Sequence, residues 1–246
     1  MDGHQADLVL TDPPYNVDYT GKTKDALKIE NDSMTDSRFR QFLTDAFKAC
    51  DAGLKPGGAF YIWHADSEGY NFRGACRDAG WTVRQCLVWV KNHFVMGRQD
   101  YQWQHEPCLY GWKDGAAHYF VEDRTQTTVM EEDNRPDIDN MKKEEMRELI
   151  KELLEEKTPT TVIREKRPAA SALHPTMKPV ALMARLIRNS TKPGELVLDT
   201  FAGSGSTLIA ADQLNRTAYV CELDPTYADV IIQRWEKLTG EKAVKQ

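Results

Sequence analysis

The last third of the chain alternates between short apolar strands and helices, and no other feature limits the possible fold as much. Residues 196–198 predict a strand, a glycine-containing turn and a helix to about residue 214 follow, and residues 217–221 predict a second strand. Strands joined by helices run parallel, and a parallel sheet is covered by helices on both faces. The sequence therefore predicts an α/β protein with a mostly parallel sheet.

The first part of the chain shows a similar alternation of strands, helices and turns. Predicted strands lie at 7–10, 59–63, 83–90 and 106–111, predicted helices at 36–50 and 67–79, a turn at 55–58 and a long polar loop at 16–35. We interpret the last two of these strands as an antiparallel pair.

The segment between these two parts is polar and rich in charge, with one predicted helix at about 140–156. We interpret this helix as packed on the body of the protein rather than as a dimer or partner surface. The predicted organisation is one half-domain at 1–112, an insertion at 113–172 and a second half-domain at 173–246.

Composition excludes several classes of protein. Of the 246 residues, 41% are hydrophobic and 28% charged, as in soluble globular proteins. The chain has neither a signal peptide nor the ~20 apolar residues of a membrane span, so we expect a cytoplasmic protein. The five cysteines form no closely spaced pair and the six histidines lack ligand spacing, so we expect reduced thiols and no metal.

Charge is distributed unevenly along the chain. The net charge of −6 argues weakly against nucleic-acid binding. Residues 122–157 carry 13 acidic and 7 basic side chains, whereas residues 158–192 carry seven Lys or Arg and only Glu165 against them. Such a basic stretch can bind phosphates on an acidic protein, and an ordinary solvated face explains it equally well.

A glycine-rich loop follows the predicted strand at 196–198. Gly203 and Gly205 allow a tight turn, and the N–H groups that begin the next helix would face a ligand there. Glu222 ends the next strand, where a carboxylate can accept hydrogen bonds from both ribose hydroxyls. This arrangement favours a nucleoside cofactor over a purely structural turn. A dehydrogenase is disfavoured because its third glycine would fall at Leu208.

A second loop, Asp12-Pro13-Pro14-Tyr15, follows the first predicted strand. The exocyclic amino nitrogen of adenine or cytosine is a poor nucleophile because its lone pair is conjugated into the ring. A carboxylate and a backbone carbonyl that accept its N–H bonds would free that lone pair, and consecutive prolines supply carbonyls at fixed φ. Tyr15 can stack on a base. A stiff turn with a surface tyrosine is an equally good interpretation of the spacing alone.

Taken together, the loop at 12–15, residues 201–205 (Phe-Ala-Gly-Ser-Gly) and residues 174–179 (His-Pro-Thr-Met-Lys-Pro) resemble the β-class DNA amino-methyltransferases. The catalytic loop precedes the cofactor loop in that class, which is a circular permutation of the common order. The resemblance spans nearly the whole chain outside the insertion. It implies a Rossmann-like S-adenosylmethionine-dependent methyltransferase fold, with a mostly parallel sheet and an antiparallel edge hairpin.

The resemblance also implies roles for individual residues. Asp12 and the Pro13 carbonyl, supported by Pro14, would hold the amino group of a base flipped out of DNA, and Tyr15 would stack on that base. The loop at 16–35 would close over the site. Lys178 and Thr207 would lie near the methionine end of S-adenosylmethionine. The full set of expected cofactor-binding residues is Thr11, Lys178, Asp199, Phe201, Gly203, Gly205, Ser206, Thr207 and Glu222.

The predicted reaction is methylation of adenine N6 in DNA, because aspartate at the first position of the loop leans toward adenine in this family. Cytosine N4 is the main alternative, RNA or protein amide methylation is less favoured, and a non-catalytic DNA-binding relative is the alternative from another class. A homodimer and a restriction partner are compatible with the family. The chain begins almost at the strand carrying Asp12, which indicates either a trimmed chain or a compact phage-like enzyme.

Two further regions have a predicted role. The insertion at 113–172 is the family's usual place for target recognition, and we hypothesise that Arg164, Lys166 and Arg167 bind phosphates there. Residues 89–94 and 101–106 mix aromatic and basic side chains. They would line the base pocket or a DNA-facing groove, although Trp89 and Trp103 are as readily explained as core residues. No histidine receives a catalytic role.

Overall fold

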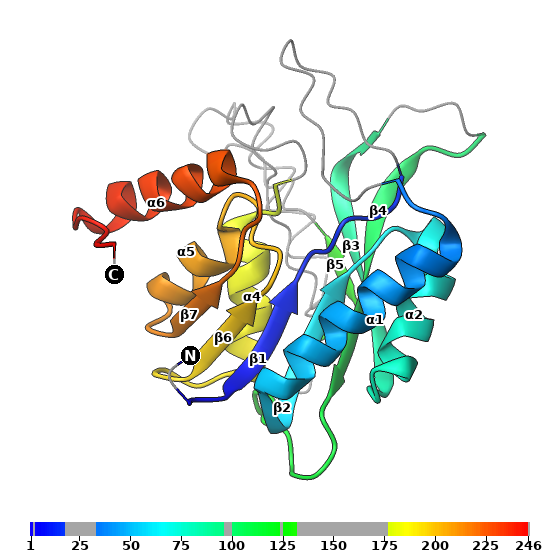
Figure 1. The fold of residues 1–246 in the computed structure, drawn as a ribbon, viewed down its shortest axis with the longest axis horizontal. Helices are drawn as coiled ribbons and strands as arrows, with labels where there is room; N and C mark the ends of the chain where they lie inside the picture. The colour runs from blue at the N-terminus through cyan, green and yellow to red at the C-terminus, as the bar shows by residue number, and fades with distance from the viewer. Residues whose placement is uncertain (2, 18–32, 96–99, 124, 132–176, 246) are drawn as a thin grey trace, which may run out of the picture.

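The computed structural model describes residues 1, 3–17, 33–95, 100–123, 125–131 and 177–245. Within them, a seven-stranded sheet runs through the molecule in the order β5-β3-β4-β2-β1-β6-β7 (Figure 1). The strands are β1 (Ala6–Thr11), β2 (Leu54–Trp63), β3 (Val83–Val95), β4 (Trp103–Trp112), β5 (Val129–Glu131), β6 (Leu196–Asp199) and β7 (Thr217–Val220). The helices are α1 (Asp36–Gly53), the 3₁₀-helix η1 (Asp66–Glu68), α2 (Gly69–Asp78), α4 (Val180–Ser190), α5 (Ser206–Gln213) and α6 (Pro225–Thr239).

The sheet is mostly parallel, as predicted. β1 pairs in parallel with β2 and β6, and β6 pairs in parallel with β7. β4 is antiparallel to both β2 and β3, which confirms the predicted antiparallel hairpin. The sequence did not predict β5, a three-residue strand that pairs in parallel with β3 outside the hairpin. Its shortness explains why no periodic pattern could reveal it.

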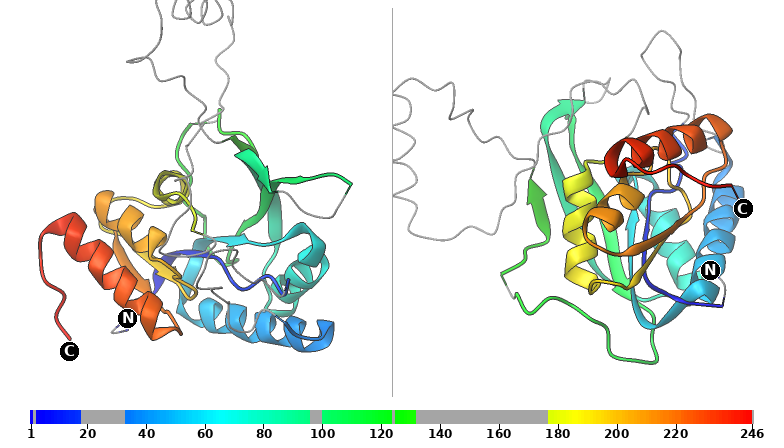
Figure 2. Two further views of the ribbon diagram at one scale, coloured as in Figure 1. Left: turned by 90° about the horizontal axis from the view of Figure 1, so that it is seen from above. Right: turned by 90° about the vertical axis from the view of Figure 1, so that its left-hand side faces the viewer.

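Helices cover both faces of the sheet, as the views in Figure 2 show. α1 and α2 lie on one face, where Phe39, Leu43 and Phe47 of α1 recur at helical spacing and are buried against the sheet and Phe72. α4 and α5 lie on the other face, where Leu186 and other apolar side chains pack against the strands. This two-sided cover accounts for the continuously buried strands in the middle of the sheet.

Local sequence signals mark both ends of α6. Asp224 caps α6 by accepting a hydrogen bond from the Thr226 N–H, Pro225 follows it, and Gly240 ends the helix at φ 76°. The predicted turn at 55–58 is instead an irregular part of β2. Gly57 has φ 77° there, and the register with β1 shifts between the pairs formed by Ala6 and Leu8.

Several predictions fall outside the described residues: the helix at 140–156, the basic cluster Arg164, Lys166 and Arg167, His174 to Thr176, and most of the loop at 16–35. Within the described part of the chain, every helix is too short or too polar to cross a membrane.

Candidate active site

The two predicted loops meet at one edge of the sheet. Asp12 directly follows β1, Asp199 ends β6, and these strands are parallel neighbours, so their carboxyl ends lie side by side (Figure 1). The buried Thr11 hydroxyl donates to Asp199 Oδ1 at 2.9 Å, which joins the ends of the two strands from which the loops start. The crevice outside such strand ends is the usual ligand site of an open α/β sheet.

The glycine loop has the conformation that its sequence predicted. Gly203 and Gly205 have φ values of 53° and 80°, a region that favours glycine. Gly205 immediately precedes α5, and no side-chain hydrogen bond caps that helix. The Glu222 carboxylate accepts hydrogen bonds from the N–H groups of Gly203 at 2.7 Å and Asp224 at 3.0 Å. Each of its oxygens keeps a second lone pair for a ligand hydroxyl.

Asp199 stabilises the glycine loop through hydrogen bonds. Its Oδ1 accepts hydrogen bonds from Thr11 and from the Phe201 N–H at 3.1 Å, and only 2% of the residue is exposed. Burial raises the pKa of Asp199 to about 6, although hydrogen bonds from Thr207, the Phe201 N–H and Thr11 oppose the rise. We infer that Asp199 shapes the loop rather than touching a ligand.

The loop at 12–15 is organised around Asp12. The Tyr15 hydroxyl donates to Asp12 Oδ1, and the Lys178 ammonium donates to Asp12 Oδ2, each at 2.6 Å. Burial raises the pKa of Asp12, and the charge of Lys178 opposes this rise. Lys178 was predicted near the cofactor's methionine end. The structure shows its ammonium on the catalytic loop, while its backbone carbonyl accepts a hydrogen bond from Ser206 at the start of α5.

Glu106 and Lys91 belong to the same cluster, although neither was assigned an individual role from the sequence. Glu106 Oε2 lies 3.0 Å from Lys178 Nζ, and Glu106 Oε1 forms an ion pair with Lys91. Burial alone would raise the pKa of Glu106, but Lys178 and Lys91 together lower it to about 2. One signal could have revealed it: along β4, Glu106 has the same phase as the buried Cys108 and Tyr110. A carboxylate with inward phase needs a buried partner.

The two tryptophans of the mixed aromatic and basic cluster differ in environment. Trp89 is 2% exposed and packs in the core, which confirms the interpretation as a core residue for Trp89. The same interpretation is wrong for Trp103, which is 40% exposed. Lys91 Nζ lies 5.5 Å from the centre of the Trp89 ring, so the core tryptophan also adjoins the charged cluster.

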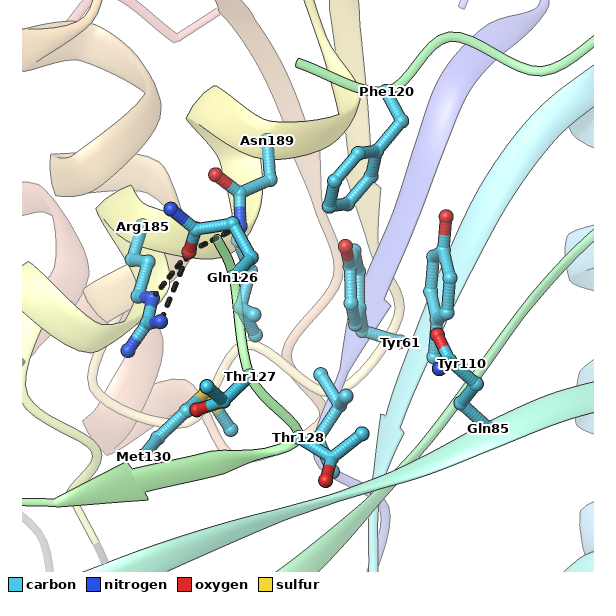
Figure 3. A pocket seen from close by; sticks show the side chains of 12 residues that line it. Tyr61, Gln85, Tyr110, Phe120, Gln126, Thr127, Thr128, Met130, Arg185 and Asn189 are labelled. Carbon is cyan, nitrogen blue, oxygen red and sulfur yellow. Dashed lines mark hydrogen bonds between the residues drawn. The ribbon is translucent and has the colours of Figure 1, made fainter. Parts of the chain in front are cut away.

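A separate cavity lies between the sheet and α4 (Figure 3). Tyr61, Tyr110 and Phe120 line one side of it, and the Arg185 guanidinium donates to the Gln126 side chain on the other. Its volume is ≈ 50 Å³, far below the roughly 300–1,000 Å³ of typical ligand pockets. None of the predicted site residues lines it, and we assign it no role.

The chain is similar to known DNA methyltransferases. The family model described as DNA methylase matches residues 6–234. The type II methyltransferase M.BglII from Bacillus subtilis is 26% identical over 94% of this chain, and this chain spans only 63% of that relative's length. The DNA adenine methyltransferase YhdJ from Escherichia coli K12 is 29% identical over 93% of this chain and 75% of its own.

A solved structure has the same fold. The crystal structure of the M1.HpyAVI–SAM complex matches 95% of this chain and 90% of its own, with a TM-score of 0.65 and 20% sequence identity. At that identity, the likeness demonstrates a shared fold and nothing further.

Proposed function

The chain belongs to the DNA methylase family, and from that premise we propose that it transfers a methyl group from S-adenosylmethionine to the N6 amino group of an adenine flipped out of DNA. One observation carries the proposal. The Thr11–Asp199 hydrogen bond joins the ends of β1 and β6, and from these ends start a loop suited to holding an amino group and a loop suited to holding a nucleoside. A related protein, YhdJ, is named as a DNA adenine methyltransferase, which supports adenine as the base.

The residues around the glycine loop fit S-adenosylmethionine. The uncapped N-terminus of α5 offers N–H groups, and the Glu222 carboxylate lies beside Gly203 with lone pairs for ribose hydroxyls. When bound, S-adenosylmethionine would supply an electrophilic methyl group to the amino nitrogen, with its sulfur as the leaving group, and the methylated nitrogen would carry one surplus proton.

The contribution of the chain is to orient the amino group and to stabilise the charge that develops on it. Asp12 accepts an N–H bond from the amino group and, as a buried carboxylate with a raised pKa, takes the surplus proton before passing it to solvent. The Pro13 carbonyl accepts the second N–H bond, and the ring of Tyr15 stacks on the base. The Pro14 ring keeps this loop rigid.

The test uses methyl-labelled S-adenosylmethionine and unmethylated DNA, followed by digestion and identification of the labelled nucleoside. N6-methyladenine is the expected product. N4-methylcytosine would retain the mechanism and change the base. Unlabelled DNA, when calorimetry shows that the cofactor binds, would refute the proposed substrate.

Asp12→Ala tests the role of the catalytic loop. We expect transfer to fall by at least about 100-fold, because the developing charge loses its carboxylate, while cofactor affinity stays within about twofold. Lys178 keeps Glu106 as a partner in this variant, so no buried cation is left without a carboxylate. Normal turnover by the variant would refute the assignment of Asp12.

A further inference from the structure

Four charged side chains form a chain of alternating sign that ends at Asp12 in the loop at 12–15. Lys91 pairs with Glu106, Glu106 with Lys178, and Lys178 with Asp12. Their side chains are between 3% and 19% exposed. The two positive and two negative charges cancel, so the cluster adds no net charge to the interior.

Stability alone does not account for this cluster. Desolvation of a buried ion pair offsets much of its Coulomb attraction, and apolar side chains of similar volume are often as stable. The cluster also joins parts of the chain that are distant in sequence. Lys178 contacts both Asp12 and Tyr15, and Glu106 contacts Tyr15, so two members reach the residues proposed to handle the base.

In this structure both oxygens of Asp12 already accept a hydrogen bond. Tyr15 occupies Oδ1 and Lys178 occupies Oδ2. The proposed reaction requires Asp12 to turn a lone pair toward the amino group and Tyr15 to turn its ring face toward the base. Each Asp12 oxygen keeps a second lone pair, but the amino group would then share an oxygen with one of these donors. A nearby alternative acceptor for the two donors would leave a whole oxygen of Asp12 to the amino group.

Glu106 is that acceptor. Its Oε2 lies 3.0 Å from Lys178 Nζ and 3.3 Å from the Tyr15 hydroxyl oxygen, so it already faces both donors. We propose that Glu106 is a positioning residue that takes over the Lys178 and Tyr15 hydrogen bonds when the base enters, which releases Asp12 for the amino group. This inference rests on the proposed function.

Lys91 completes the arrangement from the other side. Its ammonium holds Glu106 Oε1 and lies 5.5 Å from the Trp89 ring centre, so Oε2 stays directed at Lys178 and Tyr15. The low pKa of Glu106 keeps it ionised, and therefore an acceptor, at neutral pH.

Glu106→Gln tests the inference, because glutamine keeps the volume and removes the charge. We expect kcat to fall roughly 10- to 100-fold, while S-adenosylmethionine affinity stays within about twofold. The charged or titratable groups around Asp12 are Lys178, Glu106, Tyr15, Cys108, Lys91 and Asp199. Loss of the negative charge of Glu106 removes one cause of the raised Asp12 pKa, so the acidic limb of the kcat/KM profile should move to lower pH.

Three further variants separate positioning from folding. Asp114→Asn removes one negative charge from an exposed carboxylate just past β4, and its kinetics should match the wild type. Glu106→Asp should recover part of the lost rate because it restores the carboxylate. The double variant Lys91→Met/Glu106→Gln removes the cation stranded by the single change, and it should regain stability without regaining kcat.

The outcomes distinguish failure of this inference from failure of the proposed function. If the wild type binds S-adenosylmethionine and leaves DNA unlabelled, the proposed function fails. If the wild type methylates DNA, two results overturn the role of Glu106 and leave the proposed function standing. One is a Glu106→Gln turnover within twofold of wild type with an unmoved acidic limb. The other is a double variant that recovers the wild-type kcat.

Discussion

Gly205 gives the sharpest test of how the cofactor loop is built. It has φ 80°, and a Cβ placed on it would lie 3.0 Å from Ile231 Cγ1 and 3.1 Å from Ile231 Cγ2 of α6. Carbon atoms normally approach to about 3.5–4.0 Å. Gly205→Ala therefore combines an unfavourable backbone conformation with crowding against α6. Gly194 is a matched control, because it has φ 84° and nothing within 4 Å of its Cβ position.

The two substitutions share one cost and differ in the other. The left-handed conformation costs a non-glycine residue about 1–2 kcal/mol, and both variants incur this cost. Crowding adds about 1 kcal/mol or more to Gly205→Ala only. For a chain of this size, 1 kcal/mol changes Tm by about 2–4 °C, so we expect Gly194→Ala to lower Tm by about 2–8 °C and Gly205→Ala by about 2–4 °C more.

Cofactor affinity separates the variants further. If the Ile231 side chain does not shift to make room for the added Cβ, the loop moves away from α6 and displaces the N–H groups that begin α5. We expect Gly205→Ala to weaken S-adenosylmethionine binding roughly tenfold by calorimetry, which corresponds to about 1.4 kcal/mol, and Gly194→Ala to leave it unchanged. Ile231→Ala should cost about 1 kcal/mol less in the Gly205→Ala background than in the wild type, because it removes the crowding. Equal Tm losses and equal affinities for the two glycine variants would refute this account.

Three other predictions test the electrostatics of the site. Burial raises the pKa of Asp199 from 3.8 to about 6, so the stability it contributes when protonated is full below pH 3.8 and is lost as pH rises through about 6. Urea unfolding should show Asp199→Asn gaining about 2 kcal/mol relative to wild type between pH 4 and pH 7, and a pH-independent difference would count against this. Glu222→Gln should weaken S-adenosylmethionine binding about 10- to 100-fold in calorimetry, because an amide cannot accept from both the Gly203 and Asp224 N–H groups; unchanged affinity would exclude the role. Replacing Arg164 and Arg167 by Ala should weaken DNA binding and reduce its salt slope by about 2, whereas unchanged DNA affinity would contradict phosphate binding there.

The sequence predicted those features that depend on local chemistry and on chain order. A strand, a glycine turn and a helix at 196–214 were sufficient to place Gly203 and Gly205, because only a few conformations join such elements. The meeting of the loops at 12–15 and 199–207 followed because parallel strands end at the same edge of a sheet.

The partners within the site could not be predicted in the same way. Lys178 is 166 residues from Asp12 in the chain, and Glu106 is 91 residues from Tyr15. The motif containing Lys178 suggested proximity to the site but not which group its ammonium would contact. That contact depends on side-chain direction across three segments, which a single sequence leaves open. The sequence did not predict β5 for a related reason. Its three residues are too few to show a strand pattern, and the strand is defined by its pairing with β3.

The strands of the sheet end at different heights, and this explains how Glu106 reaches the site from β4, although β2 lies between β4 and β1. The last pair between β2 and β4 joins Trp63 to Cys108, and Glu106 lies two residues beyond it, past the end of β2. Lys178 crosses this gap with its ammonium 5.4 Å from the centre of the Trp63 ring, and so it contacts Asp12 on one side and Glu106 on the other. If β2 extended further, it would separate the two carboxylates. The length of β2 therefore determines that Asp12 has a second acidic residue within reach of its hydrogen-bond donors.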